Sequence, residues 1–150
     1  MQTWDSGKFD PAQISIIDIR FIKGQIEAPE SFSADAVTEY KIENTLQLYF
    51  NPADKLAKTE FIINIETVSN NSSNSEAKGY FHLIFIFRIE NLEELAKLNK
   101  NNLVETEPTL TSSLASLTYS TSRGLLINKV TDTPLHKLIL PVIDPNSLLR

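Results

Sequence analysis

The stretch that decides the fold runs from Pro108 to Pro145 and reads PTLTSSLASLTYSTSRGLLINKVTDTPLHKLILPVIDP. Its first half has apolar residues at helical spacing, and Pro108 suits the first turn of a helix capped by Thr106 or Glu107. The second half is apolar and interrupted by prolines, which is typical of an arm that lies across another surface. A helix and an arm of this kind need a sheet beneath them. We expect that sheet to come from the residues before Pro108.

The predicted helix is unusual in its high content of serine and threonine. Its buried face is predicted to consist of Leu110, Leu114, Leu117, Thr121 and Leu125. Gly124 is expected to weaken the helix near its end, because glycine loses more backbone entropy than any other residue. Small side chains let a second helix approach closely. We therefore expect this helix to contact another subunit as well as its own sheet.

Four strands are predicted before the helix, at about 14–26, 39–50, 56–68 and 79–89. The first three alternate apolar and polar residues, which is typical of half-buried strands. The apolar phase of the first strand shifts near Ile22, which indicates a bend or a bulge. The connection that follows contains Pro29 and is too long for a hairpin, so a crossover to a non-adjacent position is predicted.

The fourth strand, GYFHLIFIFRI, is apolar on both faces, which indicates that both faces are covered. The predicted helix supplies one cover. A loop, a ligand or a second subunit would supply the other, and we favour the second subunit. Residues 90–98 have leucines at helical spacing and acidic residues at their start, so a short helix or turn is predicted there.

The composition limits the possible classes of protein. A chain of 150 residues is expected to form one domain, 1–150. It has no cysteine, which excludes disulfides and thiolate sites and agrees with a reducing cytoplasm. The net charge of -5 argues against a nucleic-acid partner. Since no signal peptide or apolar run of ~20 residues is visible, a cytoplasmic protein without membrane insertion is predicted.

Residues suited to catalysis are few and scattered. His82 lies among apolar neighbours in the fourth strand and is interpreted as a structural histidine. His136 lies in the arm without other metal ligands at suitable spacing. No nucleophile elbow and no phosphate-binding loop is found. The sequence therefore predicts no enzyme, no catalytic residue, no metal and no cofactor.

Three segments, in this order, carry a resemblance to a known family. The first is KGQIEAP at 23–29, followed by Phe32, and the second is GYFHLIFIFRIEN at 79–91. The third begins at Pro108 and includes Ser-Arg-Gly at 122–124, Thr-Pro-Leu at 133–135 and Leu-Ile-Leu-Pro-Val at 138–142. Each motif is short, but together they cover most of the chain from Ile14 onward. The chain resembles the SecB family of protein-export chaperones.

The resemblance implies an α+β fold, in which a four-stranded antiparallel sheet has a crossover after its first strand and one long helix packed on one face. It also implies a homotetramer, a dimer of dimers with helices between the sheets. Family members that serve the export ATPase SecA continue into a second helix and a tail. Here the chain ends at Arg150, so that helix and tail are expected to be absent, and SecA is left open as a partner. Glu27 corresponds to an acidic family position on the partner-facing sheet surface.

Two functional hypotheses follow, and a third carries less weight. The first is an ATP-independent holdase that binds unfolded or non-native polypeptides, in protein export or in another pathway. The second is a dedicated interaction subunit for one partner, such as an antitoxin, without general chaperone activity. The third is a carrier of a small hydrophobic ligand or an unrecognised enzyme. The candidate client-binding residues, for which simple core packing is the alternative, are Ile26, Phe32, Tyr40, Leu46, Leu148 and Leu149, the last two closing one end of a groove.

Overall fold

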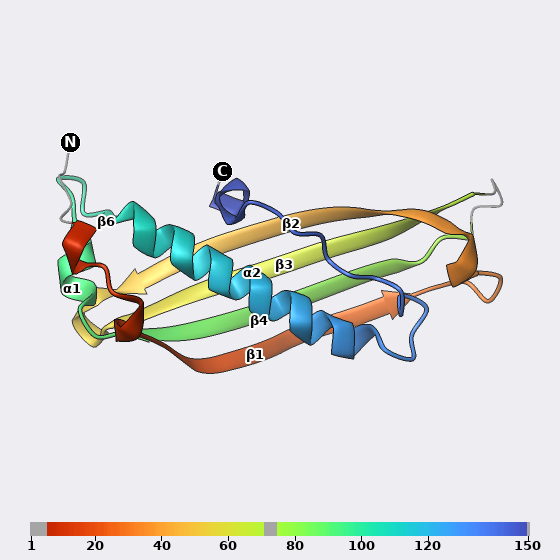
Figure 1. Cartoon of the computed structure of the whole chain (residues 1–150), viewed down its shortest axis with the longest axis horizontal. Helices are drawn as coiled ribbons and strands as arrows, with labels where there is room; N and C mark the ends of the chain where they lie inside the picture. The colour runs from red at the N-terminus through yellow and green to blue at the C-terminus, as the bar shows by residue number, and fades with distance from the viewer. Residues whose placement is uncertain (1–5, 71–74, 150) are drawn as a thin grey trace.

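A long, twisted sheet carries one long helix diagonally across one face (Figure 1). The computed structural model describes residues 6–70 and 75–149. The sheet consists of the antiparallel strands β1 (Ile14–Glu27), β2 (Val37–Asn51), β3 (Leu56–Ser69) and β4 (Lys78–Ile89), and the helix is α2 (Pro108–Val130). The strand order is β1-β4-β3-β2, so the chain crosses the whole sheet between β1 and β2. The predicted fold class, including the crossover, is confirmed.

Short elements fill the connections. They are η1 (Ser6–Lys8), η2 (Pro11–Gln13), η3 (Ala34–Ala36), η4 (Pro52–Asp54), α1 (Leu92–Leu95), β5 (Ala96–Leu98), β6 (Val104–Thr106) and η5 (Pro145–Leu149). The short helix or turn predicted within 90–98 is the single turn α1. The chain then pairs as β5 with β6, around a turn in which the Asn99 side chain accepts hydrogen bonds from the backbone N–H groups of Asn101 and Leu103. Strands of three residues are too short to show a period of two, so the sequence pattern did not predict this hairpin.

Strand β1 forms one edge of the sheet and contains two irregularities. The pairing with β4 shifts between Ile16 and Asp18 and again between Phe21 and Lys23. The second shift lies where the apolar phase predicted a bulge. Each shift leaves one isoleucine outside the ladder, and these two side chains, Ile17 and Ile22, are 52% and 50% exposed. Because β1 pairs only with β4, its outer edge is open within the sheet.

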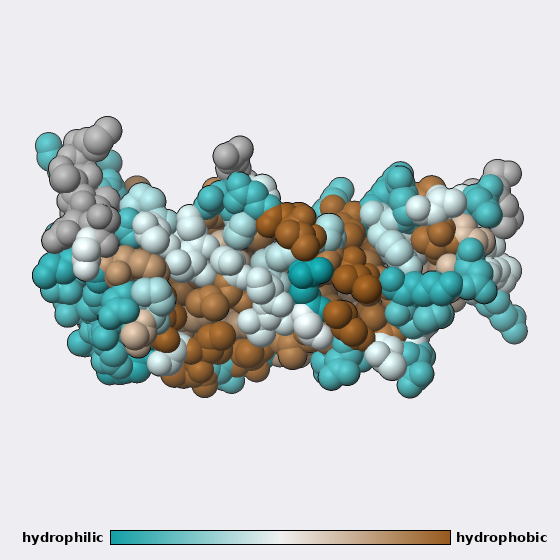
Figure 2. Space-filling model, viewed as in Figure 1, coloured by the Kyte–Doolittle hydropathy of each residue, from teal (hydrophilic) through white to brown (hydrophobic). Residues whose placement is uncertain are grey.

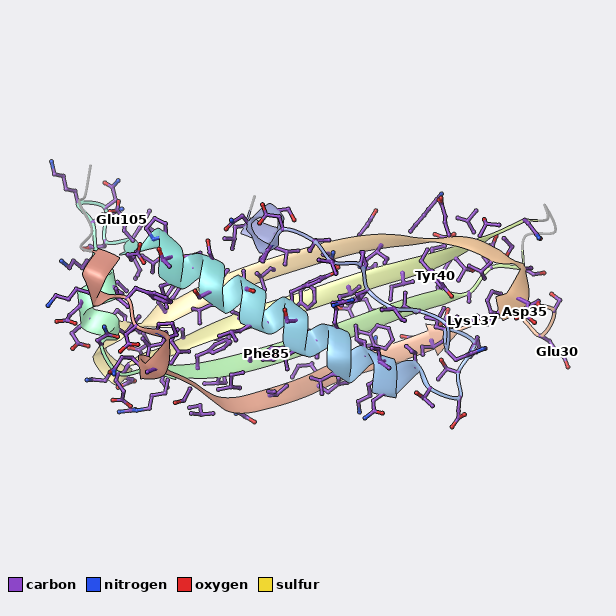
Figure 3. The ribbon with its side chains drawn as sticks, viewed as in Figure 1. Glu30, Asp35, Tyr40, Phe85, Glu105 and Lys137 are labelled. Carbon is purple, nitrogen blue, oxygen red and sulfur yellow. The ribbon has the colours of Figure 1, made fainter. Side chains whose placement is uncertain are left out.

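The core lies between the sheet and α2. The odd-numbered residues of β3 and β4 face the helix and are buried, among them Phe61, Ile63, Leu83, Phe85 and Phe87. Phe85 lies beneath α2 (Figure 3), and the ring of Tyr119 packs edge-on against Phe61 with ring centres 5.8 Å apart. Burial of apolar surface at about 25 cal/mol per Å² makes this interface the main source of stability.

Helix α2 begins as predicted, but of its predicted buried face only Leu110 and Leu114 are fully buried. The Glu107 carboxylate accepts a hydrogen bond from the Leu110 N–H, and Pro108 follows the cap. Leu117 is exposed, whereas Thr121 and Leu125 are only partly buried. The buried residues are Leu110, Leu114, Ala115, Thr118, Tyr119, Ser122, Leu126 and Val130. The pattern misled because polar residues belong to this interface: the hydroxyls of Thr118 and Thr59 pair at 2.7 Å inside the core.

The C-terminal arm, residues 131–144, turns back over the helix-covered face beside α2 and leads into η5 (Figure 1). The Tyr119 hydroxyl donates to the Pro141 carbonyl at 2.6 Å, and Arg123 Nε donates to the Leu140 carbonyl at 2.7 Å. Leu135 packs so closely on Gly79 that an added Cβ there would lie 2.7 Å from a Leu135 methyl group. The predicted arm is thus confirmed, and the surface beneath it is the chain's own sheet.

Candidate functional site

The outer face of the sheet, opposite α2, is formed by the even-numbered residues of β3 and β4 and their neighbours on β1 and β2. Its centre is apolar, with Ile62, Ile84 and Ile86 partly exposed. Strand β4 therefore carries apolar side chains on both faces, as its sequence indicated. Within one chain, however, only the face beneath α2 is fully buried.

The outer face contains one row in which charges of opposite sign face one another. Directly opposed residues form one row across all four strands, in the order Glu27, Lys78, Glu66 and Lys41. Glu27 also accepts a hydrogen bond from the Gln25 amide at 2.6 Å. Acidic and basic residues occur there in equal number: Asp18, Glu27, Glu39, Glu43, Glu60 and Glu66 against Arg20, Lys23, Lys41, Lys58, Lys78 and Arg88. Glu27 thus lies on the outer face, where acidic and basic residues are balanced.

An apolar groove runs along the flank between β1 and α2. Its volume is about 510 Å³, and it is lined by Phe9, Pro11, Ile14, Ile16, Ser113, Ser116 and Leu117. Exposed Ile19 and the two bulge isoleucines of β1 extend the apolar strip along the sheet edge. Hydrophobic surface gathers over this flank in Figure 2. We call these residues together the β1–α2 flank.

Three of the predicted client-binding residues lie at the crossover end of the sheet. Ile26 lies near the end of β1, Tyr40 lies near the start of β2, and Phe32 belongs to the loop between them. All three are partly buried against the core. Burial raises the pKa of the Tyr40 hydroxyl, and the nearby Lys137 ammonium acts in the opposite direction.

The other three predicted residues lie in the middle of β2 and on η5. Leu46 is buried in the middle of the strand, about 20 Å from Tyr40 at roughly 3.3 Å per residue. Leu148 and Leu149 belong to η5, which packs against β2 and α2, and they are partly buried. The predicted residues therefore form two groups on the same face, and the C-terminal arm runs between them (Figure 1).

The arm itself supplies apolar side chains that the sequence analysis missed. Ile139 is 62% exposed and Val142 is 83% exposed, while Leu138 and Leu140 point into the core. Alternation in Leu-Ile-Leu was a usable signal for Ile139, because an extended segment on a sheet turns every second side chain outward. The alternation ends at Pro141, so it did not indicate that Val142 is exposed. The β5–β6 hairpin adds three more exposed aliphatic residues that were not predicted: Leu98, Leu103 and Val104.

In residues 6–70 and 75–149, no group of three or more histidine, cysteine, aspartate or glutamate side chains could hold a metal ion. His82 Nε2 lies 3.7 Å from Glu60 Oε1, and His136 Nδ1 lies 3.0 Å from the Thr133 carbonyl. No helix in this part of the chain is both long and apolar enough to cross a membrane. The arm, the β1–α2 flank and the β5–β6 hairpin each expose large apolar side chains.

Comparison with known proteins identifies the fold. No protein-family model matches the chain, and no curated protein sequence matches it. Among solved structures, it resembles a SecB-like chaperone of Mycobacterium tuberculosis in complex with a ChAD peptide from the HigA1 antitoxin. The TM-score is 0.63 at 16% sequence identity, over 88% of this chain and 91% of the other. The chain has a SecB-like fold, as its sequence motifs indicated.

Proposed function

We propose that this protein is a cytoplasmic chaperone that holds non-native polypeptides without using ATP. The observation that carries the proposal is the exposed aliphatic surface of the arm, Ile139 and Val142, on a SecB-like fold. This surface lies between the two groups of candidate residues. An extended client would run from Phe32 and Tyr40 along the arm to η5.

Binding at this surface would depend on apolar burial. Each Å² of apolar surface removed from water contributes about 25 cal/mol, before the cost of ordering the bound chain is subtracted. A client that makes many weak contacts along the arm gains affinity without requiring one sequence. The client would be released when its own folding competes with binding, so release would require no nucleotide.

The test is suppression of aggregation of a diluted, unfolded client protein by the full chain. The double variant Ile139→Asp/Val142→Asp is expected to lose most of this activity while keeping the fold, because both side chains point away from the core. Leu98→Asp is a matched control, since this leucine is 65% exposed but lies on the β5–β6 hairpin. A wild-type chain that suppresses no aggregation contradicts the general holdase.

A dedicated partner is the second candidate. It is favoured by the solved SecB-like neighbour, whose bound ligand is a peptide from an antitoxin. Capture of one stoichiometric partner, together with no protection of unrelated clients, would support this candidate over the general holdase. A role in export with SecA has less support, because the balanced charges of the outer face give no acidic platform for a basic partner.

We also propose that the chain forms homo-oligomers through the β1–α2 flank, with a dimer of dimers as the expected assembly. The open edge of β1 and the exposed Ile16, Ile17, Ile19 and Ile22 support this assignment, since an uncovered apolar edge strand is prone to pair with another chain. Mass measurement in solution tests it. Ile19→Asp should reduce the mass by at least half, and a monomeric wild-type chain would contradict the proposal.

A further inference from the structure

The loop that crosses from β1 to β2, residues 28–36, is tied to the C-terminal arm by one ion pair. The Lys137 ammonium on the arm pairs with the Asp35 carboxylate on η3 (Figure 3). Both side chains are solvent-exposed, at 49% for Lys137 and 85% for Asp35. The hydrogen bond from Lys137 lowers the pKa of the Asp35 carboxyl group below its usual range.

The two partners differ in how firmly the backbone around them is held. Lys137 lies between Leu135 and Leu138, which are 0% and 3% exposed and anchor the arm in the core. Five of the nine residues of the crossover loop are exposed, and the loop contacts the core through Ala28 and Phe32. At its end, the Ala36 carbonyl accepts a hydrogen bond from the Asn70 N–H at 2.9 Å. Ser31 adds a hydroxyl contact with Ser75 at 2.7 Å. The ion pair therefore joins a fixed segment to a lightly held one.

The loop also carries part of the candidate client surface. Phe32 belongs to it, and Ile26 and Tyr40 lie on the strands at its two ends. Movement of the loop away from the arm would carry Phe32, which is now partly buried against the core, away from its present position.

We propose that the Lys137–Asp35 pair is a latch that closes the crossover end of the client surface and opens when a client or added salt displaces it. The proposal rests on the function proposed above. An exposed ion pair favours the closed loop only slightly and is screened by salt, which is what a reversible closure requires. An incoming apolar client buries more surface on binding than is exposed when this ion pair opens.

Hydrogen exchange of residues 28–36 in the full chain, without any client, tests the latch directly. Lys137→Met and Asp35→Asn are each expected to speed exchange in this loop by roughly twofold to fivefold. The charge-reversed pair Lys137→Asp/Asp35→Lys should restore the slow rate. Lys100→Met, on the exposed hairpin turn, is the matched control and should leave the loop unchanged. Salt at about 0.5 M should bring the wild-type rate to that of the variants.

Client association then separates this proposal from the proposed function. If the latch closes the site, the association rate of an unfolded client should rise in Lys137→Met by about the same factor as loop exchange. Loop exchange that is unchanged in both single variants overturns the latch, even when clients bind normally. Slower client association in Lys137→Met also overturns it. If no client binds to the wild-type chain while the variants exchange faster, the ion pair restrains the loop but the chaperone function is wrong.

Discussion

Neighbouring residues on β4 show how the two faces of the sheet differ. Phe85 points beneath α2 and is 0% exposed, whereas Ile84 points to the outer face and is only partly buried. Both are large and apolar, and their surroundings differ only in what covers them. The helix and the arm make one face a core, while the other face combines a small apolar centre with paired charges. When a strand is apolar on both sides, the rest of the chain therefore determines which side is buried in the core.

The most direct test of this difference between the two faces is to truncate one residue on each of them. Phe85→Ala should destabilise the protein by about 3–5 kcal/mol, because it leaves a cavity between β4 and α2. Ile84→Ala should cost less than about half as much, since its side chain is not enclosed. Denaturant unfolding measures both. Equal losses would mean that the outer face is also buried, by a second copy of the chain.

The polar contact within the core offers the next largest effect. Thr118→Val leaves the Thr59 hydroxyl buried without its partner, which should cost about 1–3 kcal/mol. The double variant Thr59→Val/Thr118→Val should recover most of this loss, because no polar group is then left unsatisfied. A double-mutant cycle in urea measures the coupling. Additive losses would contradict the hydroxyl pair.

The attachment of the arm should have a smaller effect. Tyr119→Phe removes the hydroxyl that donates to the Pro141 carbonyl but keeps the ring on Phe61, so the expected loss is about 0.5–1.5 kcal/mol. Tyr49→Phe is the control, because the Tyr49 hydroxyl bonds to Gln47 at an exposed position on the outer face. Equal unfolding free energies for the two variants would show that this hydrogen bond does not stabilise the attachment of the arm.

The paired charges of the outer face should give the smallest effect. Glu27→Gln removes one member of the row that continues through Lys78, Glu66 and Lys41, and should change the unfolding free energy by less than about 0.5 kcal/mol. Partner capture by Glu27→Gln should equal that by the wild type. Loss of a partner in this variant would show that Glu27 does take part in docking.

Much of the fold could be predicted from the sequence because its signals are local. A few neighbouring residues are enough to indicate the alternation in the strands, the phase shift near Ile22 and the crossover at Pro29. They also limited the cap of α2 to Thr106 or Glu107, and the structure has Glu107 there. The face of α2 could not be predicted in this way. Thr118 and Ser122 face the core although they are polar, and Leu117 faces outward although it is apolar. The orientation depends on Thr59 and Phe61, which are about sixty residues away in the chain.

The candidate site shows the same division. Sequence motifs indicated Phe32, Tyr40 and the leucines of η5 as candidates, but the exposed Ile139 and Val142 of the arm were missed. The contact of Lys137 with Asp35 joins residues 102 positions apart, which no local pattern can reveal.

The sequence alone was enough to predict the strands, the crossover, the long helix and the arm. Hydrophobic periodicity and the positions of prolines influence the backbone over a few residues, so they can be recognised locally. The tertiary structure was needed to show which face of β4 lies in the core, which side of α2 is buried and what the arm covers. These choices depend on contacts between distant segments, where shape and hydrogen-bond partners outweigh the polarity of any single residue.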